Sequence, residues 1–146
     1  MSAEQKSLKQ IIDFRKEKLN ELRKKGINPY PSNFTPTHFS ESIKNYFEKL
    51  EGEYVLVAGR IMAIRKMGKA SFFRIIDNEG GIQIFIKKDD IGDNSYENFK
   101  LFDIGDFVGV NGQVFKTKTG EISIRASKLT LLAKSIRPLP IVKEKD

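Results

Sequence analysis

The hydrophobic pattern divides the chain into two stretches. Over residues 2–25, apolar residues recur every three or four positions, which is the period of an α-helix. From Tyr54 onward, short apolar runs rich in β-branched residues are separated by Gly, Asp and Asn, which is typical of strands and turns. The pattern therefore predicts a helical N-terminal part followed by a β-rich part.

The N-terminal part is predicted to hold a basic amphipathic helix and a shorter second helix. Gly26 and the prolines within residues 27–31 end the first helix, because proline lacks the amide hydrogen that a helix needs. The second helix is predicted between Ser40 and Gly52. Its apolar side consists of Ile43, Tyr46, Phe47 and Leu50.

Five strands are predicted in the second part, near residues 54–66, 70–77, 81–87, 106–116 and 121–131. Residues 78–81 and 117–120 have the composition of hairpin turns. A short helix is predicted around residues 96–102, between the third and fourth strands, and ends at residues 103–106. Five antiparallel strands with a helix after the third are the element order of the OB-fold.

The predicted fold class is therefore mainly β with α: a five-stranded OB-fold Greek-key barrel preceded by amphipathic helices. Another small barrel or a fragment of a sandwich is the alternative. The predicted organisation is a helical segment at 1–52, the barrel at 53–134 and a linker at 135–146.

Charge and composition narrow the classes of function. The 146 residues include 26 Lys and Arg against 19 Asp and Glu, and the net charge of +7 favours a polyanionic partner such as nucleic acid. The absence of cysteine excludes disulfides, cysteine–zinc sites and thiol catalysis, and the single His38 excludes a multi-histidine metal site. No apolar run reaches the roughly 18 residues of a membrane-spanning helix. We expect a cytoplasmic protein without a membrane partner, and a binding module, because no catalytic motif is present.

The segment from Arg60 to Arg74 carries five cations and two adjacent phenylalanines with no acid between them. Cations hold phosphates and rings stack on bases, so this composition is typical of single-stranded nucleic-acid binding. Strand alternation places Phe72 on the face of Arg74, opposite Phe73. A face that bears Arg74 is unlike a core, so Phe72 is predicted to be an exposed ring, and a core position for it stays the alternative.

Gln83 and Glu121 are further candidates for contacts with bases. Alternation in the third strand places Gln83 and Phe85 opposite the isoleucines, and a glutamine amide both donates and accepts hydrogen bonds. Glu121 follows the turn at Gly120 and has the acceptors that bind base amino or imino groups. From the residues alone, a solvated side chain is the favoured interpretation at both positions. In the first strand, apolar residues occur at both odd and even positions, so alternation does not show on which face of the strand Arg65 lies. A bulge at Gly59 is one way in which the inward face could change from odd to even positions.

Several stretches occur together in one order: residues 18–23, 29–31, 58–62, 67–72, 81–83, 115–123 and 137–140. They read KLNELR, PYP, AGRIM, MGKASF, GIQ, FKTKTGEIS and RPLP. In this combination the chain resembles the N-terminal anticodon-binding domain of class II lysyl-tRNA synthetases. The resemblance covers residues 15–140, and it implies an OB-fold that binds the anticodon stem-loop of lysine tRNA.

The resemblance also implies residue roles. Phe72 corresponds to the phenylalanine that stacks on the central anticodon base, Gln83 and Arg65 bind that base, and Glu121 contributes to a neighbouring position. The sequence departs from the bacterial pattern at Ile64, where a second basic residue is common. Contacts with the RNA backbone are expected from Arg15, Lys16, Arg23, Lys24, Arg60, Lys69 and Arg74.

In that family the catalytic domain follows the stretch matched by residues 137–140, uses ATP and magnesium, and belongs to a homodimer. The sequence stops at Asp146, so we expect no cofactor in this chain and no charging of tRNA by it alone. Three alternatives remain: a general single-stranded nucleic-acid binder, the equivalent domain of an aspartyl- or asparaginyl-tRNA synthetase, and a protein-interaction module that uses the apolar side of the first helix.

Overall fold

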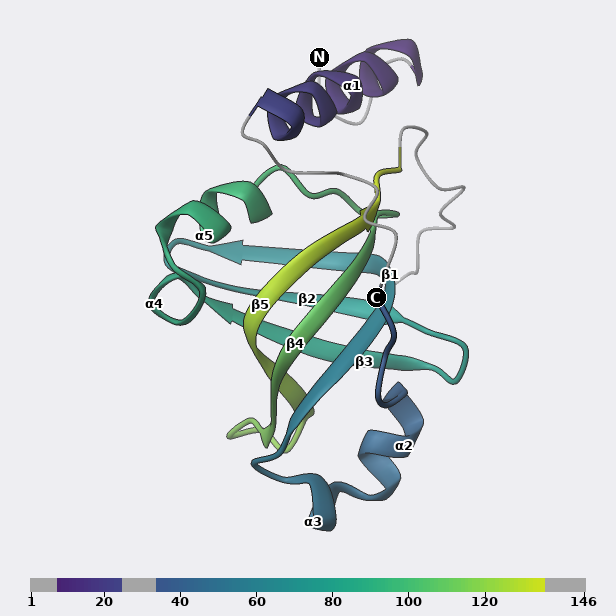
Figure 1. The fold of residues 1–146 in the computed structure, drawn as a ribbon, viewed down its shortest axis with the longest axis vertical. Coiled ribbons are helices and arrows are strands. Elements are labelled where there is room, and N and C mark those ends of the chain that lie inside the picture. The colour runs from purple at the N-terminus through teal and green to yellow at the C-terminus, as the bar shows by residue number, and fades with distance from the viewer. Residues whose placement is uncertain (1–7, 25–33, 136–146) are drawn as a thin grey trace.

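A computed structural model describes residues 8–24 and 34–135 of the chain. Its strands form a barrel with helices at both ends (Figure 1). The helices are α1 (Leu8–Lys24), α2 (Ser40–Asn45), α3 (Phe47–Leu50), α4 (Lys88–Ile91) and α5 (Asp93–Phe99). None of these described helices is long and apolar enough to cross a membrane.

The strands are β1 (Tyr54–Met67), β2 (Ala70–Ile76), β3 (Gly81–Lys87), β4 (Phe107–Lys116) and β5 (Ile122–Ala133). They form a closed barrel in the order β1–β2–β3–β5–β4, which confirms the predicted OB-fold class. The prediction that all neighbours are antiparallel is wrong for β3 and β5, which run parallel. A parallel pair needs a long crossover, and here the chain passes through α4, α5 and β4 between the two strands.

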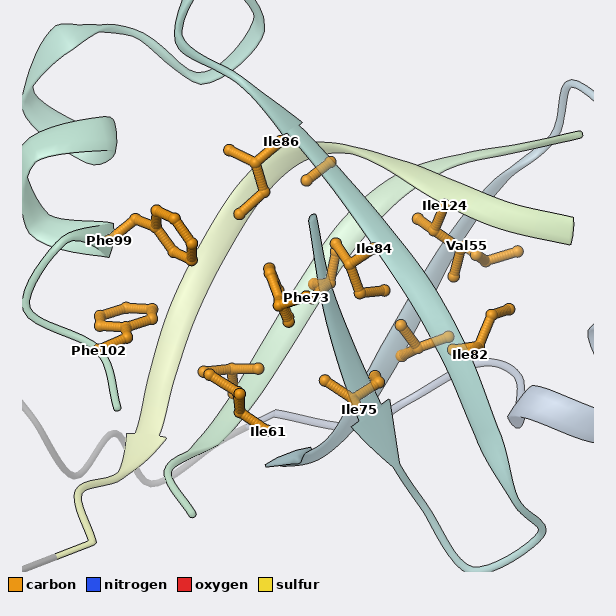
Figure 2. Packing of buried hydrophobic residues seen from close by; sticks show 14 of the residues in the cluster. Val55, Ile61, Phe73, Ile75, Ile82, Ile84, Ile86, Phe99, Phe102 and Ile124 are labelled. Carbon is orange, nitrogen blue, oxygen red and sulfur yellow. The ribbon is translucent and has the colours of Figure 1, made fainter. Parts of the chain in front are cut away.

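Alternate residues of the strands build the core. Phe73 and Ile75 of β2 and Ile82, Ile84 and Ile86 of β3 are at most 2% exposed. Figure 2 shows these side chains pointing into the space that the strands enclose. Burying one such side chain contributes about 1.5–3 kcal/mol, so this alternation fixes which residues face outward as firmly as which face inward.

β1 switches its inward face midway because it contains a β-bulge. Its register against β2 shifts between Ile61 and Ala63, so the extra residue is Met62 rather than Gly59. Glycine is required at position 59 for another reason: a Cβ there would lie 2.7 Å from the backbone oxygen of Ile76. The bulge bends β1, which pairs with β4 along its first half and with β2 along its second half.

α5 closes the barrel end that the β1–β2 turn approaches. Phe99 is fully buried, and its ring centroid lies 5.7 Å from that of Phe73 (Figure 2). The hydroxyl of Tyr96 donates a hydrogen bond to the backbone oxygen of Gly68 at 2.7 Å. The single helix predicted around residues 96–102 is therefore a pair, α4 and α5, that starts earlier and ends at Phe99.

α2 and α3 lie at the opposite end of the barrel (Figure 1). Ile43 is fully buried there, as predicted, but Tyr46 is 60% exposed. The chain leaves helical geometry at Tyr46, which separates α2 from α3 and turns this side chain away from the apolar side. Asp77 ties α2 to the β2–β3 turn, because its carboxylate accepts hydrogen bonds from the amide and the hydroxyl of Ser40, both at 2.7 Å.

Charged residues hold α1 against the barrel. The ammonium of Lys18 on α1 lies 2.6 Å from a carboxylate oxygen of Asp103. Lys134, fully buried, lies 2.6 Å from the other oxygen of Asp103 and 2.7 Å from Asp106. We call Lys18, Asp103, Asp106 and Lys134 the charged junction.

Candidate nucleic-acid interface

The outer face of β2 and β3 carries the candidate residues that alternation had placed there. Phe72 pairs with Phe85 across the two strands, and Arg74 pairs with Gln83. On the other side, Phe72 pairs with Arg65 of β1. The Met62 bulge is what turns Arg65 outward, so the pairing answers the question that the sequence left open.

A cavity of about 530 Å³ lies on this face, and we call it the outer-face pocket. It brings Arg65, Phe72, Gln83 and Glu121 together, although they come from three strands and a turn. The complete lining is Ala63, Ile64, Arg65, Phe72, Phe73, Arg74, Gln83, Thr117, Lys118, Thr119 and Glu121. Its lining combines the groups that bind nucleotides: an aromatic ring, an amide, a carboxylate and cations.

The Phe72 ring is half-buried and rests on other rings. Its centroid lies 4.9 Å from that of Phe85 with an interplanar angle of 35°, and Phe85 lies 6.0 Å from Phe115. These contacts fix the orientation of Phe72 while the ring still lines the outer-face pocket. A ring held in place in this way loses little entropy when a base stacks on it.

The amide of Gln83 is oriented by a short hydrogen-bond chain. Its Nε2 donates to the hydroxyl of Ser123 at 3.1 Å, and that hydroxyl donates to the backbone oxygen of Glu121 at 3.3 Å. Ser123 is fully buried, so the chain is anchored in the barrel wall. An amide held by one donor hydrogen keeps acceptor capacity for a base edge.

The β4–β5 turn holds Glu121 at the rim of the pocket. The amide of Glu121 donates to the hydroxyl of Thr117 at 3.0 Å, and the amide of Gly120 donates to the Thr117 backbone oxygen at 2.9 Å. Gly120 has a φ of +91°, which favours glycine. Thr117, Lys118 and Thr119 line the pocket as well, although the hairpin-turn pattern at 117–120 does not by itself predict contacts with a ligand.

The cations of the pocket stay exposed. Among the described residues, neither Arg65 nor Arg74 has a carboxylate in ion-pair distance. By contrast, Arg125 on β5 binds Asp90 through two hydrogen bonds of 2.7 and 2.8 Å. With Lys118, the lining holds three cations against Glu121, its one acid, and this excess favours a polyanionic ligand.

The other predicted backbone contacts are spread over the molecule. Lys16 is exposed on α1, and Lys69 is exposed in the β1–β2 turn. Arg60 lies over the ring of Phe107 at 4.5 Å, away from the outer-face pocket. The side chain of Arg15 is only 12% exposed and lies 3.9 Å from Asp103. The side chains of two further candidates, Arg23 and Lys24, lie outside the described residues.

His38 lies beside Thr37, whose hydroxyl is 2.8 Å from its Nδ1, and takes no part in the outer-face pocket. Within residues 8–24 and 34–135, no three His, Cys, Asp or Glu side chains gather as a metal site would need.

Comparisons with known proteins point to the same part of the chain. A family model named tRNA_anti-codon, an OB-fold nucleic acid binding domain, matches residues 55–132. The chain is 52% identical to the lysine–tRNA ligase of Thermoanaerobacter pseudethanolicus over 134 residues, and 51% identical to that of Moorella thermoacetica over 130 residues. These matches cover 91% and 89% of this chain but 27% of each relative. The chain thus spans about a quarter of the length of the curated relatives it matches.

Proposed function

Since the chain belongs to the tRNA_anti-codon family of OB-fold nucleic acid binding domains, we propose that it recognises the anticodon of lysine tRNA. One observation carries the proposal: Arg65, Phe72, Gln83 and Glu121 line a single pocket. The names of the relatives, lysine–tRNA ligases at about half identity, supply the amino-acid class of the tRNA.

The pocket suggests a division of labour among its side chains. The central anticodon base stacks on Phe72, which contributes about 1–3 kcal/mol. Gln83 hydrogen-bonds the Watson–Crick edge of that base, and Arg65 binds it from β1. Glu121 accepts a hydrogen bond from a neighbouring base, and Arg74 and Lys118 neutralise nearby phosphates.

The longer protein implied by the relatives supplies the remaining chemistry. Ligation of lysine to tRNA, with ATP and magnesium, belongs in this proposal to a part of the relatives that this chain does not span. In this proposal, homodimer formation also belongs to that part of the relatives. The role of this chain is to select the tRNA by its anticodon.

The test is a fluorescence titration of the chain with a stem-loop that carries the lysine anticodon UUU. The control is the same stem-loop with an aspartate anticodon, and both are measured at about 0.05 M and about 0.2 M salt. We expect a preference for UUU that persists at the higher salt, because base contacts depend less on counterions than phosphate contacts do. Equal binding of both loops that disappears with salt would instead identify a general single-strand binder.

A further inference from the structure

A second cavity, of about 350 Å³, lies between α1 and the end of β1, and we call it the α1 pocket. Its lining is Arg15, Ile64, Lys66, Phe102, Asp103 and Ile104. Ile64 also lines the outer-face pocket, so both cavities border β1 at this residue. Lys66 is absent from the set of residues expected to contact RNA.

Lys66 carries a positive charge that the described residues do not neutralise. Its ammonium donates to the backbone oxygen of Lys100 at 3.0 Å and lies 5.8 Å from the centre of the Phe99 ring. The one acid of the α1 pocket, Asp103, is already bound at 2.6 Å by both Lys18 and Lys134.

The electrostatics of the α1 pocket favour an anion. Burial and the nearby charge of Lys18 lower the pKa of Lys66, and Asp103 offsets only part of this effect. Arg15 lines the same wall, where its guanidinium lies 3.9 Å from Asp103, a longer distance than the 2.6 Å of Lys18 and Lys134. An anion bound in the pocket that Lys66 and Arg15 line relieves the repulsion between Lys66 and Lys18, and a phosphate is the anion that a nucleic acid brings.

The second half of β1 borders both pockets. β1 pairs with β4 only from Tyr54 to Arg60, and its second half pairs only with β2. After Ile61, the edge of β1 that faces away from β2 pairs with no described strand. Arg65 and Lys66 are consecutive on this segment, so their side chains leave opposite faces of the strand. Arg65 reaches the outer-face pocket and Lys66 reaches the α1 pocket.

We propose that the α1 pocket is a phosphate subsite, in which Lys66 and Arg15 bind a backbone phosphate of the RNA whose base occupies the outer-face pocket. This inference rests on the proposed function.

The first experiment compares Lys66→Gln with the matched variant Lys49→Gln. Lys49 is an exposed lysine of α3, at the other end of the barrel (Figure 1). We expect Lys66→Gln to weaken UUU stem-loop binding about three- to tenfold and to lower the salt slope by about 0.7, the value for one single-strand phosphate. The preference for UUU should stay unchanged, and Lys49→Gln should leave affinity and slope close to those of the parent chain.

The second experiment uses the unaltered protein and needs no variant to fold. Stem-loops carry one neutral methylphosphonate at each loop position in turn. We expect one position, next to the base in the outer-face pocket, where the substitution weakens binding by the parent chain but adds nothing to the loss in Lys66→Gln. Inorganic phosphate at matched ionic strength should compete only weakly, because the subsite is aligned for a phosphate that the bound base positions.

The results separate the two proposals. A parent chain that prefers UUU, together with additive losses at every methylphosphonate position in Lys66→Gln, overturns the phosphate subsite and leaves anticodon recognition standing. A parent chain with no preference for UUU overturns the proposed function itself. Strong competition by inorganic phosphate would identify a site for a free anion and would likewise overturn the RNA subsite.

Discussion

The charged junction and the outer-face pocket are both rich in cations, but they use them in opposite ways. In the junction, Lys134 and Asp106 are fully buried and lie 2.7 Å apart. In the pocket, Arg65 and Arg74 are exposed and have no carboxylate partner among the described residues. A buried cation needs an acid to offset its desolvation, and an exposed cation beside an aromatic ring stays available for a ligand. Net charge alone does not distinguish these roles.

The acids of the junction also differ from each other. Burial would raise the pKa of Asp103, but hydrogen bonds from Lys134 and Lys18 outweigh it, and the pKa ends below its ordinary value. Burial raises the pKa of Asp106, and Lys134 offsets only part of that effect. In the junction, the charged form of Asp103 is therefore stabilised, whereas that of Asp106 is destabilised by burial.

Removing the central cation of the junction should have the largest effect. Lys134→Met leaves Asp106 buried without its cation and leaves Asp103 with Lys18 and the more distant Arg15, which should cost about 3–5 kcal/mol of unfolding free energy. Urea unfolding followed by circular dichroism measures this loss. Lys128→Met, at an exposed lysine of β5, the strand that ends just before Lys134, is the matched control and should change stability by less than about 0.5 kcal/mol. Equal stability of the two variants would show that the junction does not hold the fold.

Removing the ring of the outer-face pocket should affect binding rather than stability. Phe72→Ala removes a half-buried stacking surface, so affinity for the UUU stem-loop should fall by about 1–3 kcal/mol. Fluorescence titration measures the affinity, and urea unfolding should show a smaller loss than the adjacent core variant does.

That adjacent variant is Phe73→Ala, which removes a ring that is 2% exposed. It should cost about 3–5 kcal/mol of stability, because it leaves a cavity beside Phe99. The two variants delete the same atoms one residue apart, so they isolate the effect of strand face. If Phe72→Ala unfolds the protein as readily as Phe73→Ala does, the outer ring belongs to the core and the stacking role is wrong.

A smaller effect is expected from Gln83, because one neutral hydrogen bond has a net value of about 0.5–1.5 kcal/mol. Gln83→Leu keeps the volume of the side chain and removes its amide. Discrimination between UUU and UCU stem-loops should fall by that amount, while the stacking on Phe72 keeps most of the affinity. The ratio of the two dissociation constants is the readout, and an unchanged ratio would exclude Gln83 from reading the central base.

The sequence predicted the parts of this comparison that depend on local patterns. Strand alternation placed Phe72 and Gln83 outward, and the isoleucines of β3 explain why, because each is fully buried. Alternation failed for Arg65 because a bulge at Met62 shifts the register, and a strand that is apolar on both parities does not reveal where its bulge lies. The role of Arg65 came from the family resemblance instead.

The charged junction was not predicted because it joins residues far apart in the chain. Lys18 and Asp103 are separated by 85 positions, and Lys134 lies beyond both. No local spacing marks such a group. The sequence pattern also did not predict the parallel pairing of β3 with β5, because this pairing depends on how the barrel closes. The α1 pocket depends on both the junction and the closure, and the sequence alone therefore did not single out Lys66.

The smallest expected effect concerns acid, because the two junction carboxyls respond in opposite directions. The pKa of Asp103 is lowered on folding, so its contribution is complete above its ordinary pKa of 3.8 and disappears as the pH falls through the folded value. The raised pKa of Asp106 means that the folded state takes up that proton first, which partly offsets the loss. Asp103→Asn removes only the first contribution. The stability difference between the parent chain and Asp103→Asn, measured by urea unfolding from about pH 6 to about pH 2.5, should therefore shrink below about pH 4. A constant difference over this range would mean that Asp103 is not the stabilised carboxylate, and the distinction between the two acids of the junction would no longer hold.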